Sequence, residues 1–460
     1  MELEVAKSLI KKHTEGHQAF IMANEVANRY YRVQNDILMQ KPKKEEVDNP
    51  LRSADNRIAH SFYNLLVNQK AAYMFTAPPV FDVKDDALNT AIVNALGDGY
   101  TKKTKDLCVN ACNAGVAWVH YWNEDGAFQW AVVSSDEVIP IFSKRLDKEL
   151  VAALRVYTDI DETDGKLYTI YEYWNDTACE SFRREASVSI DEGLQLYSSF
   201  SWVSEGTEQE SNVYMHELGA VPFIPFYNNN IASRDLDLIK RLIDAYDKTY
   251  SGFMNDLEDI QEVIFILTNY GGEDKAELLR DLKYYKAVQF DSIGGDDKSG
   301  LSTLTIEIPV EARDKMLEIT RKAIFDMGQG IDPQQQGLDG TSGEAMKFLY
   351  SLLELKAGMT ETEFRLGFNR LVRAICLSKG KDIGTITQTW TRTSIRNDAE
   401  LVDMCSKSMG VISRKTILKN HPFVESAEDE EKELQAEETE DYFEGQETSV
   451  KTDGGNNDET

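Results

Sequence analysis

The chain has 460 residues, of which 42% are hydrophobic and 28% charged, so it should form two or three soluble, globular domains with a substantial core. Its formal net charge of -29 argues against tight, non-specific DNA binding, because affinity for phosphate comes mainly from lysine and arginine. Apolar runs are too short to span a membrane, the N-terminus lacks a signal-peptide core, and five scattered cysteines indicate reduced thiols, so we expect a cytoplasmic protein.

Helical patterns dominate the first quarter of the chain. Apolar residues recur at helical spacing over 1–38, and a second helix is expected between the Asn49-Pro50 turn and Pro78. A third helical pattern covers 87–113. The chain therefore begins with three predicted helices.

Two pairs of potential metal ligands lie on these helices. Cys108 and Cys112 are four residues apart, but two small buried side chains are a commoner reason for such a pair than half of a metal site. His13 and His17 could share a helical face, and because spacing suggests no third ligand we expect that face to be solvated. We therefore predict no metal site and no cofactor.

From Val116 the hydrophobic period changes to two. Residues 116–133 predict a hairpin around an Asn-Glu-Asp-Gly turn, and further alternating runs continue as a meander to about Tyr227. The segment 221–230, with two prolines and three asparagines, marks a predicted boundary. Residues 1–230 thus form an α+β domain with a β-rich half.

A long helix is predicted over 231–268, with Ser233 as its cap. Its apolar residues are spaced alternately three and four apart for over four heptads: Leu236, Ile239, Ile243, Tyr246, Tyr250, Phe253, Leu257, Ile260, Ile264 and Leu267. Such a stripe needs a partner, which is either a helix of the same domain or a neighbouring subunit; the pattern leaves both open. For the second case, the packing residues are Tyr246, Tyr250, Phe253 and Leu257.

A small α/β insert over 269–308 follows, and Pro309 begins a returning helix over 309–328. Two helices with an insert at their tip form a predicted stalk. The next segment, GQGIDPQQQGLDG, is rich in glycine and glutamine and offers no apolar anchor, so we predict a mobile loop over 329–340.

A second long helix is predicted over 341–380. Thr341 and Glu344 form a capping box, and Lys379-Gly380 forms a basic last turn followed by a glycine. Between these caps, apolar residues recur at helical spacing: Ala345, Phe348, Leu349, Leu352, Leu355 and Met359, then Phe364, Phe368, Leu371, Val372 and Ile375.

The C-terminal part contains a predicted strand over 381–397 and two short helices, near 398–409 and 414–420, within 398–425. Beyond it, 425–460 holds 15 acidic residues and 2 lysines with almost no aliphatic content. Residues 426–460 are therefore expected to be a solvated, disordered tail.

Motifs of catalysis are missing from the sequence. It contains no P-loop, zinc-protease or nucleophile-elbow pattern. The acidic pairs Asp85-Asp86 and Asp296-Asp297 lie in turn-like sequence, where solvated residues are commoner than ligands of a two-metal nuclease. We therefore predict that the protein is not an enzyme.

Five stretches, in order, carry a family resemblance: NQKAAYMFTAPP, DLDLIKRLIDAYDKTYSGFMNDLEDIQEVIFIL, YYKAVQF, EIPVEARDKMLEITRKAIFDMGQGIDP and SGEAMKFLYSLLELKAG. Together they resemble the portal proteins of tailed bacteriophages, in the branch typical of long-tailed phages of Gram-positive hosts. The resemblance covers about 50–400 and is strongest over 234–380.

The resemblance implies a portal-type fold in named parts. Residues 1–230 with the strand 381–397 correspond to the wing, 231–268 and 309–328 to a two-helix stem, and 269–308 to a small α/β clip. The tunnel loop would be 329–340, the long wing helix 341–380 and a helical crown 398–425, with 426–460 matching no part.

The resemblance also implies a role. The protein would form a homo-oligomeric ring, a dodecamer in the capsid, at one vertex of the virion. The ring would assemble in the host cytoplasm, and no membrane would be among its partners. Double-stranded DNA would pass through the ring during packaging and ejection. The other partners would be the terminase, the head-tail connector, and the major capsid and scaffolding proteins, with the clip residues Lys283, Tyr284, Tyr285 and Lys286 touching the motor and connector.

Side-chain chemistry agrees with a DNA-facing tunnel loop. Glutamine amides make and break hydrogen bonds with phosphate easily, whereas arginines would hold the duplex. The candidate residues are Gln329, Gln334, Gln335, Gln336 and Asp339. The alternative for this loop is a connector without DNA contact.

Alternatives for the whole chain are a metal-dependent nucleic-acid enzyme or accessory packaging factor, and a scaffold that binds partners through its acidic tail.

Overall fold

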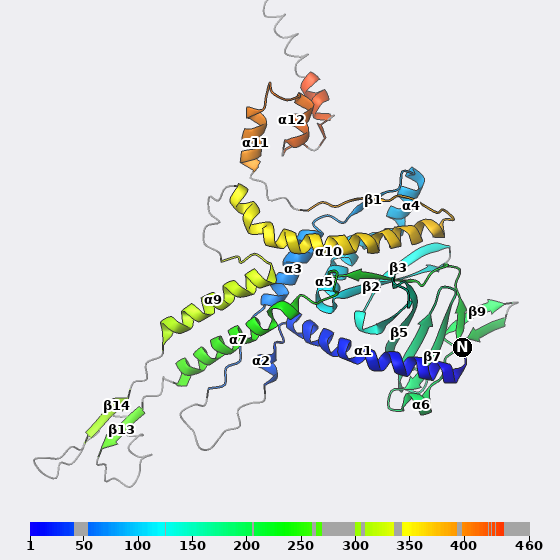
Figure 1. Cartoon of the computed structure of the whole chain (residues 1–460), viewed down its shortest axis with the longest axis horizontal. Helices are drawn as coiled ribbons and strands as arrows, with labels where there is room; N and C mark the ends of the chain where they lie inside the picture. Colours follow the sequence, from blue (N-terminus) through cyan, green and yellow to red (C-terminus); the bar gives the residue numbers. More distant parts are fainter. Residues whose placement is uncertain are drawn as a thin grey trace, which may run out of the picture. The chain divides into compact units, whose positions relative to one another are not determined.

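The computed structural model describes residues 1–40, 54–124, 126–204, 207–259, 264–268, 300–304, 309–334, 343–392 and 398–436, except 422, 425 and 428 (Figure 1). The chain forms two compact units, 1–332 with 352–392, and 333–351 with 393–460, and each is described by itself. Helices and sheets are both abundant, which agrees with the predicted α+β class. Within the described residues, no helix is long and apolar enough to cross a membrane.

The described residues of the first quarter form the helices α1 (Leu3–Tyr31), α2 (Asp36–Met39), α3 (Phe62–Met74), α4 (Asp86–Leu96) and α5 (Tyr100–Ala114). The predicted first helix is interrupted at Val33, where φ is +61°, and the predicted third helix is interrupted at Gly97, where φ is +72°. Neither left-handed residue can continue a right-handed helix. The predicted second helix begins only at Phe62, and residues 54–61 before it are not helical.

The predicted hairpin is confirmed. Strands β2 (Val116–Glu124) and β3 (Ala127–Val133) pair antiparallel from Trp118 opposite Val133 to Glu124 opposite Ala127. The predicted boundary segment instead supplies β12 (Phe223–Tyr227), which pairs with β2 at the edge of this three-stranded sheet. An edge position tolerates Pro225, because one side of the strand needs no ladder hydrogen bonds.

A larger antiparallel sheet has the order β11-β7-β6-β5-β4, with β8 also paired to β7. It is the predicted meander. Its strands are β4 (Val138–Phe142), β5 (Leu150–Ile160), β6 (Leu167–Trp174), β7 (Ala178–Glu185), β8 (Gln195–Leu196) and β11 (Val213–Met215). The connections hold a short 3-10 helix (Ser135–Glu137), α6 (Ile190–Gly193) and the hairpin of β9 (Phe200–Ser204) and β10 (Thr207–Ser211).

Helices α7 (Leu236–Asp259) and α9 (Val310–Gly328) lie side by side (Figure 1). The prediction of one helix over 231–268 is wrong at both ends. Ser233 lies three residues before α7, and the stripe residues Ile264 and Leu267 belong to strand β13 (Ile264–Thr268), which pairs with β14 (Gly300–Leu304). Strand pairing thus overrides the helical spacing there. The returning helix agrees with its prediction, with Pro309 at the N-cap.

Helix α10 (Gly343–Ser378) is the longest in the described residues. Its C-terminus is as predicted: the Lys381 and Gly380 amides donate to the carbonyls of Cys376 and Leu377, and Gly380 has a φ of +71°. Of the strand predicted over 381–397, β15 (Thr387–Thr389) is present and pairs with β1 (Val80–Asp82). Thr341 and 393–397 lie outside the described residues.

The second unit contains α11 (Asp398–Lys407) and α12 (Arg414–Asn420), which agree with the two predicted short helices. The tail prediction needs one correction, because residues 429–436 are helical. Glutamate, lysine and leucine are good helix formers, and Lys432 pairs with Asp429 three residues away. Residues 437–460 lie outside the described residues.

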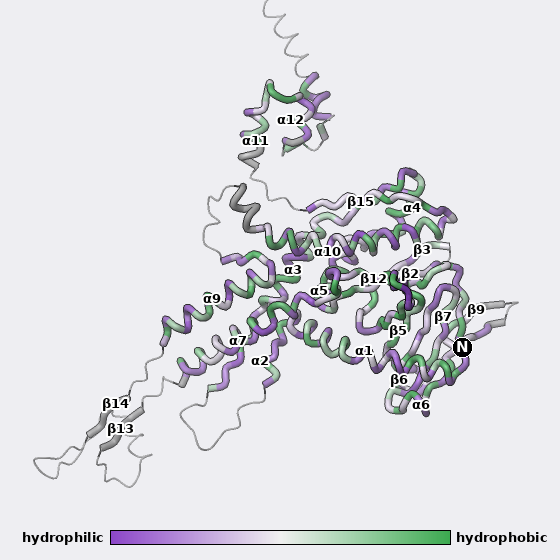
Figure 2. Tube along the Cα trace, in the orientation of Figure 1, coloured by the Kyte–Doolittle hydropathy of each residue, from purple (hydrophilic) through white to green (hydrophobic). Residues whose placement is uncertain are grey.

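The principal core joins α3, α5, the three-stranded sheet and α10, and Figure 2 shows apolar segments along these elements. Its largest buried side chains include Tyr63, Leu66, Phe75, Phe226, Phe364 and Phe368. Smaller clusters lie between the two sheets, around Trp118 and Trp174, and under α1, around Ile10 and Phe182.

The structure describes both pairs of potential metal ligands, Cys108 with Cys112 and His13 with His17. Cys108 and Cys112 are buried in the core as small side chains. The prediction of a solvated histidine face is wrong for His17, which is buried and donates from Nε2 to the carbonyl of Asp136 at 3.1 Å. Burial lowers the pKa of His17.

Asp85 caps α4, because its Oδ1 accepts from the amides of Ala87 and Leu88.

Candidate functional site at the junction of α7, α9 and α10

The loop that follows α9 starts from a rigid end. Gln329 adopts a left-handed conformation with φ of +54°, and the amides of Gln329 and Gly330 donate to the carbonyls of Asp326 and Phe325. These two bonds satisfy the last carbonyls of the helix in a Schellman arrangement. The chain therefore leaves α9 in one defined direction.

Close packing against α3 fixes the same segment. A Cβ atom built on Gly328 or Gly330 would lie 2.7 Å or 2.1 Å from a methyl carbon of Leu66, so only glycine allows the backbone this close. The Gln69 amide then donates to the Ile331 carbonyl at 2.7 Å and accepts from the Ile331 amide at 3.0 Å.

An ion pair completes this anchor. The Arg321 guanidinium donates to both carboxylate oxygens of Asp332, at 2.9 Å and 2.7 Å. A bidentate pair of this kind fixes orientation as well as distance. The start of the predicted mobile loop, 329–332, is therefore held in place by polar contacts from α3 and α9, which the residues of the loop do not reveal by themselves.

A buried ionic cluster lies directly behind this anchor. Asp235, just before α7, accepts from Lys356 Nζ of α10 at 2.9 Å and lies 3.4 Å from Lys70 Nζ of α3. The three side chains are 7%, 8% and 1% exposed. Burial alone would raise the pKa of Asp235, but attraction by Lys356 and Lys70 outweighs it and holds the pKa of that carboxyl well below its usual range.

Neutral groups extend the cluster. Lys70 Nζ donates to Asn228 Oδ1 at 2.6 Å, and Asn228 Nδ2 donates to Asp235 Oδ1 at 2.8 Å. Thr360 Oγ1 donates to the Asn228 carbonyl at 2.7 Å, and Lys356 Nζ donates to the Gly328 carbonyl at 2.9 Å. The cluster thus joins α3, the end of β12, the start of α7, the end of α9 and α10 at one point.

An extended segment, 54–61, runs along α7. The amides of Asn56, Ile58 and His60 donate to side chains of Asn255, Ser251 and Asp247, respectively. Alternate residues of an extended chain advance about 6.6 Å, close to the roughly 6 Å between residues four apart on a helix, so the two repeats match. The sequence patterns predict a helix here and miss this pairing.

Three of the four predicted inter-subunit residues of α7 have partners within the chain. The rings of Tyr246 and Tyr250 lie edge-on to His60, at 4.7 Å and 4.8 Å between centroids. The Arg313 guanidinium lies 5.5 Å from the Phe253 ring, and Leu257 is exposed. These contacts favour the same-domain alternative for the stripe, and a contact of these residues with a neighbouring subunit stays a prediction.

Helix α10 has two apolar faces. At roughly 100° per residue, Leu352, Leu355, Met359, Leu366 and Leu377 fall on one stripe, and all are exposed. The buried stripe lies on another face and comprises Leu353, Lys356, Ala357, Thr360, Phe364, Phe368, Leu371, Val372, Ile375 and Cys376. The apolar residues predicted at helical spacing are thus divided between the two faces, with Leu352, Leu355 and Met359 on the exposed one. Ala345, Phe348 and Leu349 lie among side chains that the structure leaves undescribed.

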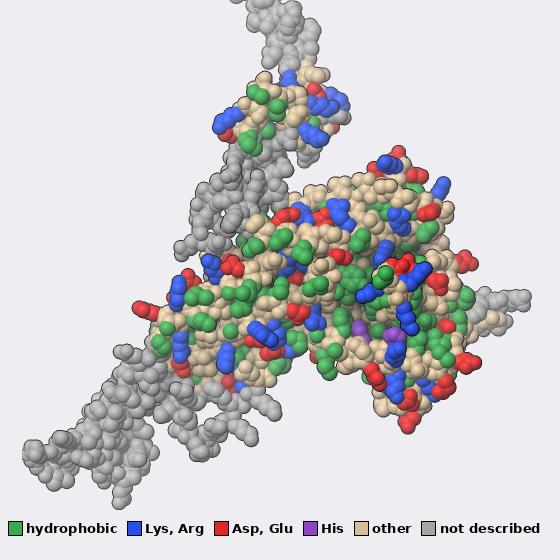
Figure 3. Space-filling view, in the orientation of Figure 1, with side chains coloured by type: hydrophobic (Ala, Val, Ile, Leu, Met, Phe, Trp, Pro, Cys, Tyr) green, Lys and Arg blue, Asp and Glu red, His purple; other side chains and the backbone are tan. Residues whose placement is uncertain are grey.

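Exposed apolar side chains also line α9. Met316, Ile319 and Met327 share one face and are 51%, 54% and 57% exposed. Figure 3 shows hydrophobic side chains gathered over α9 and the neighbouring part of α10. Apolar rows on two adjacent helices are typical of a surface that another protein covers.

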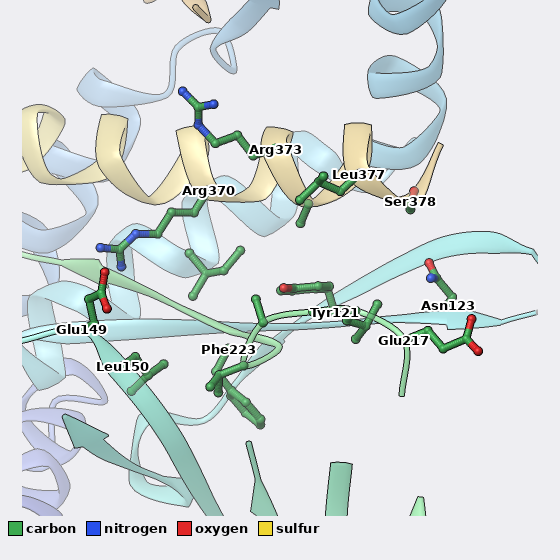
Figure 4. Close-up of a pocket in the computed structure, with 16 residues that line it drawn as sticks. Tyr121, Asn123, Glu149, Leu150, Glu217, Phe223, Arg370, Arg373, Leu377 and Ser378 are labelled. Atoms are coloured by element: carbon green, nitrogen blue, oxygen red, sulfur yellow. The ribbon is translucent and has the colours of Figure 1, made fainter. Parts of the chain in front are cut away.

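A pocket of about 700 Å³ lies between the C-terminal half of α10 and the three-stranded sheet. Tyr121, Leu150 and Phe223 form its apolar floor (Figure 4). Arg370 and Arg373 line it from α10, and Arg373 donates to the carbonyls of Ile383 and Gly384. Glu149 and Glu217 also line the pocket, so its charges are mixed.

The predicted DNA-facing residues fall into two groups. Gln329 is part of the anchored end and is half-buried, whereas Gln334 is exposed. Gln335, Gln336 and Asp339 lie outside the described residues, as do Asp296, Asp297 and the predicted clip residues Lys283, Tyr284, Tyr285 and Lys286. In the part of the chain that the structure describes, no three His, Cys, Asp or Glu side chains are grouped to hold a metal ion.

Comparison with known proteins gives a family. Residues 10–443 match the family described as phage portal protein, SPP1 Gp6-like. The portal protein of Clostridium phage phiCD119 is 39% identical over 465 residues, which cover 96% of this chain and 99% of that protein. The portal protein of Bacillus phage SPP1 is 28% identical over 447 residues, covering 94% and 86%.

Among solved structures, a chain from the neck of an empty GTA particle computed with C6 symmetry aligns with 78% of this chain and 88% of its own length. Its TM-score of 0.42 and identity of 11% are too low to support an argument. The family match and the two relatives extend over nearly the whole chain, and they agree with the five resembling stretches. The chain therefore belongs to the SPP1 Gp6-like family of phage portal proteins and has a portal function.

Proposed function

We propose that this protein forms a homo-oligomeric ring, a dodecamer, at one vertex of a phage capsid, and that double-stranded DNA passes through its central channel. In this proposal 1–230 with 381–397 is the wing, α7 and α9 are the stem, and 269–308 is the clip that docks terminase and the head-tail connector. The tunnel loop is 329–340 and the crown is 398–425. The protein works as a structural channel and not as an enzyme.

One observation carries the ring proposal: the exposed apolar rows on α9 and on α10. A second copy of the chain could cover both rows, and a contact between unlike faces of two copies closes into a ring when the rotation between them divides a full turn. Met327, in the row of α9, is two residues before Gln329, where the anchored end of the loop begins, so a contact there would hold the loop in a fixed place around the ring.

The charge of the chain supports a channel for DNA. With a net charge of -29, its walls would repel phosphate and leave weak, transient contacts, which suit a sliding duplex better than a basic groove. The glutamines at 334–336 then supply neutral hydrogen-bonding groups for those contacts.

The ring contact is tested by placing charge in the apolar row of α10. The double substitution Leu355→Asp and Met359→Asp should abolish the ring, as measured by size-exclusion chromatography with light scattering and by negative-stain imaging. Both side chains are exposed in the single chain, so its fold should survive. The matched control is Val93→Asp on α4, which is also exposed and lies outside both rows. Rings that persist in the double variant would remove this surface from the interface.

The loop is tested by deletion of 334–336. This change leaves the anchors at Ile331 and Asp332 in place, so ring assembly should be normal. DNA packaging or retention should fall, as measured by nuclease-protected DNA in phage particles that carry the variant. Normal packaging would show that these glutamines do not line the DNA path.

A further inference from the structure

The buried ionic cluster of Asp235, Lys70 and Lys356 contains two ammonium groups and one carboxylate, so it has one positive charge in excess. Asp235 is buried with two ammonium groups, those of Lys70 and Lys356, although either one neutralises its charge. Burying an additional cation is costly unless other groups stabilise it. One of the two lysines must therefore be stabilised by a further contact in addition to its pairing with the carboxylate.

The contacts of the two lysines differ in one respect. Lys70 donates to Asn228 Oδ1 and faces Asp235, so both of its partners lie at the junction of β12 and α7. Lys356 also donates to the Gly328 carbonyl at 2.9 Å, which belongs to the last turn of α9. The carbonyl end of a helix carries a partial negative charge and favours a cation.

This contact places Lys356 between the two helices that the loop connects. Its own helix, α10, follows the loop, and Gly328 immediately precedes it. The segment after Gly328 is the one held by Leu66, Gln69 and Arg321. A substitution of Lys356 would therefore loosen the end of α9 and so alter the position of the loop that follows it.

We propose that Lys356 is a positioning residue for the tunnel loop: it fixes the end of α9 against α10 and α7, and thereby sets the point from which the loop enters the channel. Lys70, in contrast, binds Asn228 and Asp235 at the junction of β12 and α7. This inference rests on the proposed function insofar as the loop faces DNA, but the position of the loop can be measured without DNA.

The test compares Lys356→Met with Lys70→Met in the assembled ring. Each substitution removes one buried ammonium and leaves Asp235 with the other. Hydrogen exchange should become faster by about tenfold or more at the amides of Gly330 and Ile331 in Lys356→Met, and should stay within about twofold of the wild type in Lys70→Met. Amides of β5 and β6 serve as the internal reference.

The functional readout is DNA retention in particles. Lys356→Met should reduce it, with rings still forming, and Lys70→Met should not. Equal exchange at Gly330 and Ile331 in the two variants would overturn the proposal, as would faster exchange in Lys356→Met without loss of DNA retention when deletion of 334–336 does impair packaging. If deletion of 334–336 leaves packaging normal while Lys356→Met still accelerates exchange, the loop's DNA role fails and the positioning contact stands. Should Lys356→Met not fold, Lys356→Gln against Lys70→Gln makes the same comparison.

Discussion

The two halves of α10 are held in place by different forces. The C-terminal half, 361–378, lies in the principal core, where the rings of Phe364 and Phe368 pack 5.2 Å and 5.0 Å from that of Phe226. A Cβ atom on Gly367 would lie 2.6 Å from the Phe226 ring, so glycine allows this approach. In 352–360 of the N-terminal half, Leu353 and Ala357 are buried too, but Lys356 and Thr360 add an ion pair and hydrogen bonds.

The difference separates stability from function along one helix. Apolar packing has no direction, so it holds the C-terminal half firmly without defining a unique contact for it. Ion pairs and hydrogen bonds require particular atoms at particular distances, so they define the position of the half next to the loop. The following substitutions test this division.

The largest effect is expected for Asp235→Ala. It leaves Lys70 and Lys356 buried without a carboxylate, which should lower the free energy of unfolding by about 3–5 kcal/mol or more. Urea unfolding followed by tryptophan fluorescence measures it. The control is Asp237→Ala, whose exposed pair with Arg234 should contribute less than about 1 kcal/mol. A similar loss in both variants would show that the buried cluster is not special.

Phe368→Ala tests the other half. A cavity in the core should lower the free energy of unfolding by about 3–5 kcal/mol, whereas the exposed Leu366→Ala should change it by less than about 0.5 kcal/mol. Phe368→Ala should leave hydrogen exchange at Gly330 and Ile331 close to that of the wild type under native conditions. Selective loosening of the loop's anchor by Phe368→Ala would contradict the division between the halves.

The dependence of stability on pH should separate the two regions as well. Burial lowers the pKa of His120, in β2 beneath the pocket, to about 4. Because the unfolded chain binds this proton near pH 6.5, stability should fall as the pH drops from 6.5 towards 4, by up to about 3 kcal/mol. His120→Phe should remove the part of this slope that His120 contributes, in urea titrations at several pH values, and leave the part due to His17, whose pKa burial also lowers.

The ionic cluster responds at lower pH. The pKa of Asp235 is depressed in the folded state, so its contribution is fully present above the ordinary pKa of 3.8 and is lost only below it. An unchanged slope between pH 6.5 and 4 in His120→Phe would rule out His120 as its source.

The smallest effect is expected for Thr360→Val. The change keeps the shape of a side chain that is 1% exposed but removes its hydrogen bond to the Asn228 carbonyl, at a cost of about 1 kcal/mol. Thr362→Val, which removes an exposed bond to the Gly358 carbonyl, is the control and should be nearly neutral. If both variants matched the wild type, the hydroxyl would have no part in holding this half of α10.

Local signals in the sequence were sufficient for several elements. Alternation and the turn residues predicted the hairpin of β2 and β3, and the helix-end signal at Gly380 predicted the end of α10. The bounds of α9, α11 and α12 were also close to prediction. In each case the deciding residues are neighbours in the chain, so their spacing alone carries the information.

The candidate site could not be predicted in this way. Its groups come from four segments that are far apart in the chain: Lys70 of α3, Asn228 and Asp235 between β12 and α7, Gly328 of α9, and Lys356 of α10. No spacing between them distinguishes a buried cluster from solvated surface charges. The anchors of the loop, Leu66 and Gln69, were equally hidden, because they belong to a helix more than 250 residues earlier.

The sequence by itself determined the family, the mixture of helices and sheet, and the presence of apolar residues at helical spacing along α7 and α10. Only the tertiary structure decided which face of α10 is buried, and where the stripe of α7 passes into a strand. The physical reason is that propensity and periodicity act between near neighbours, whereas burial and the pairing of charges depend on which distant segments the fold brings together.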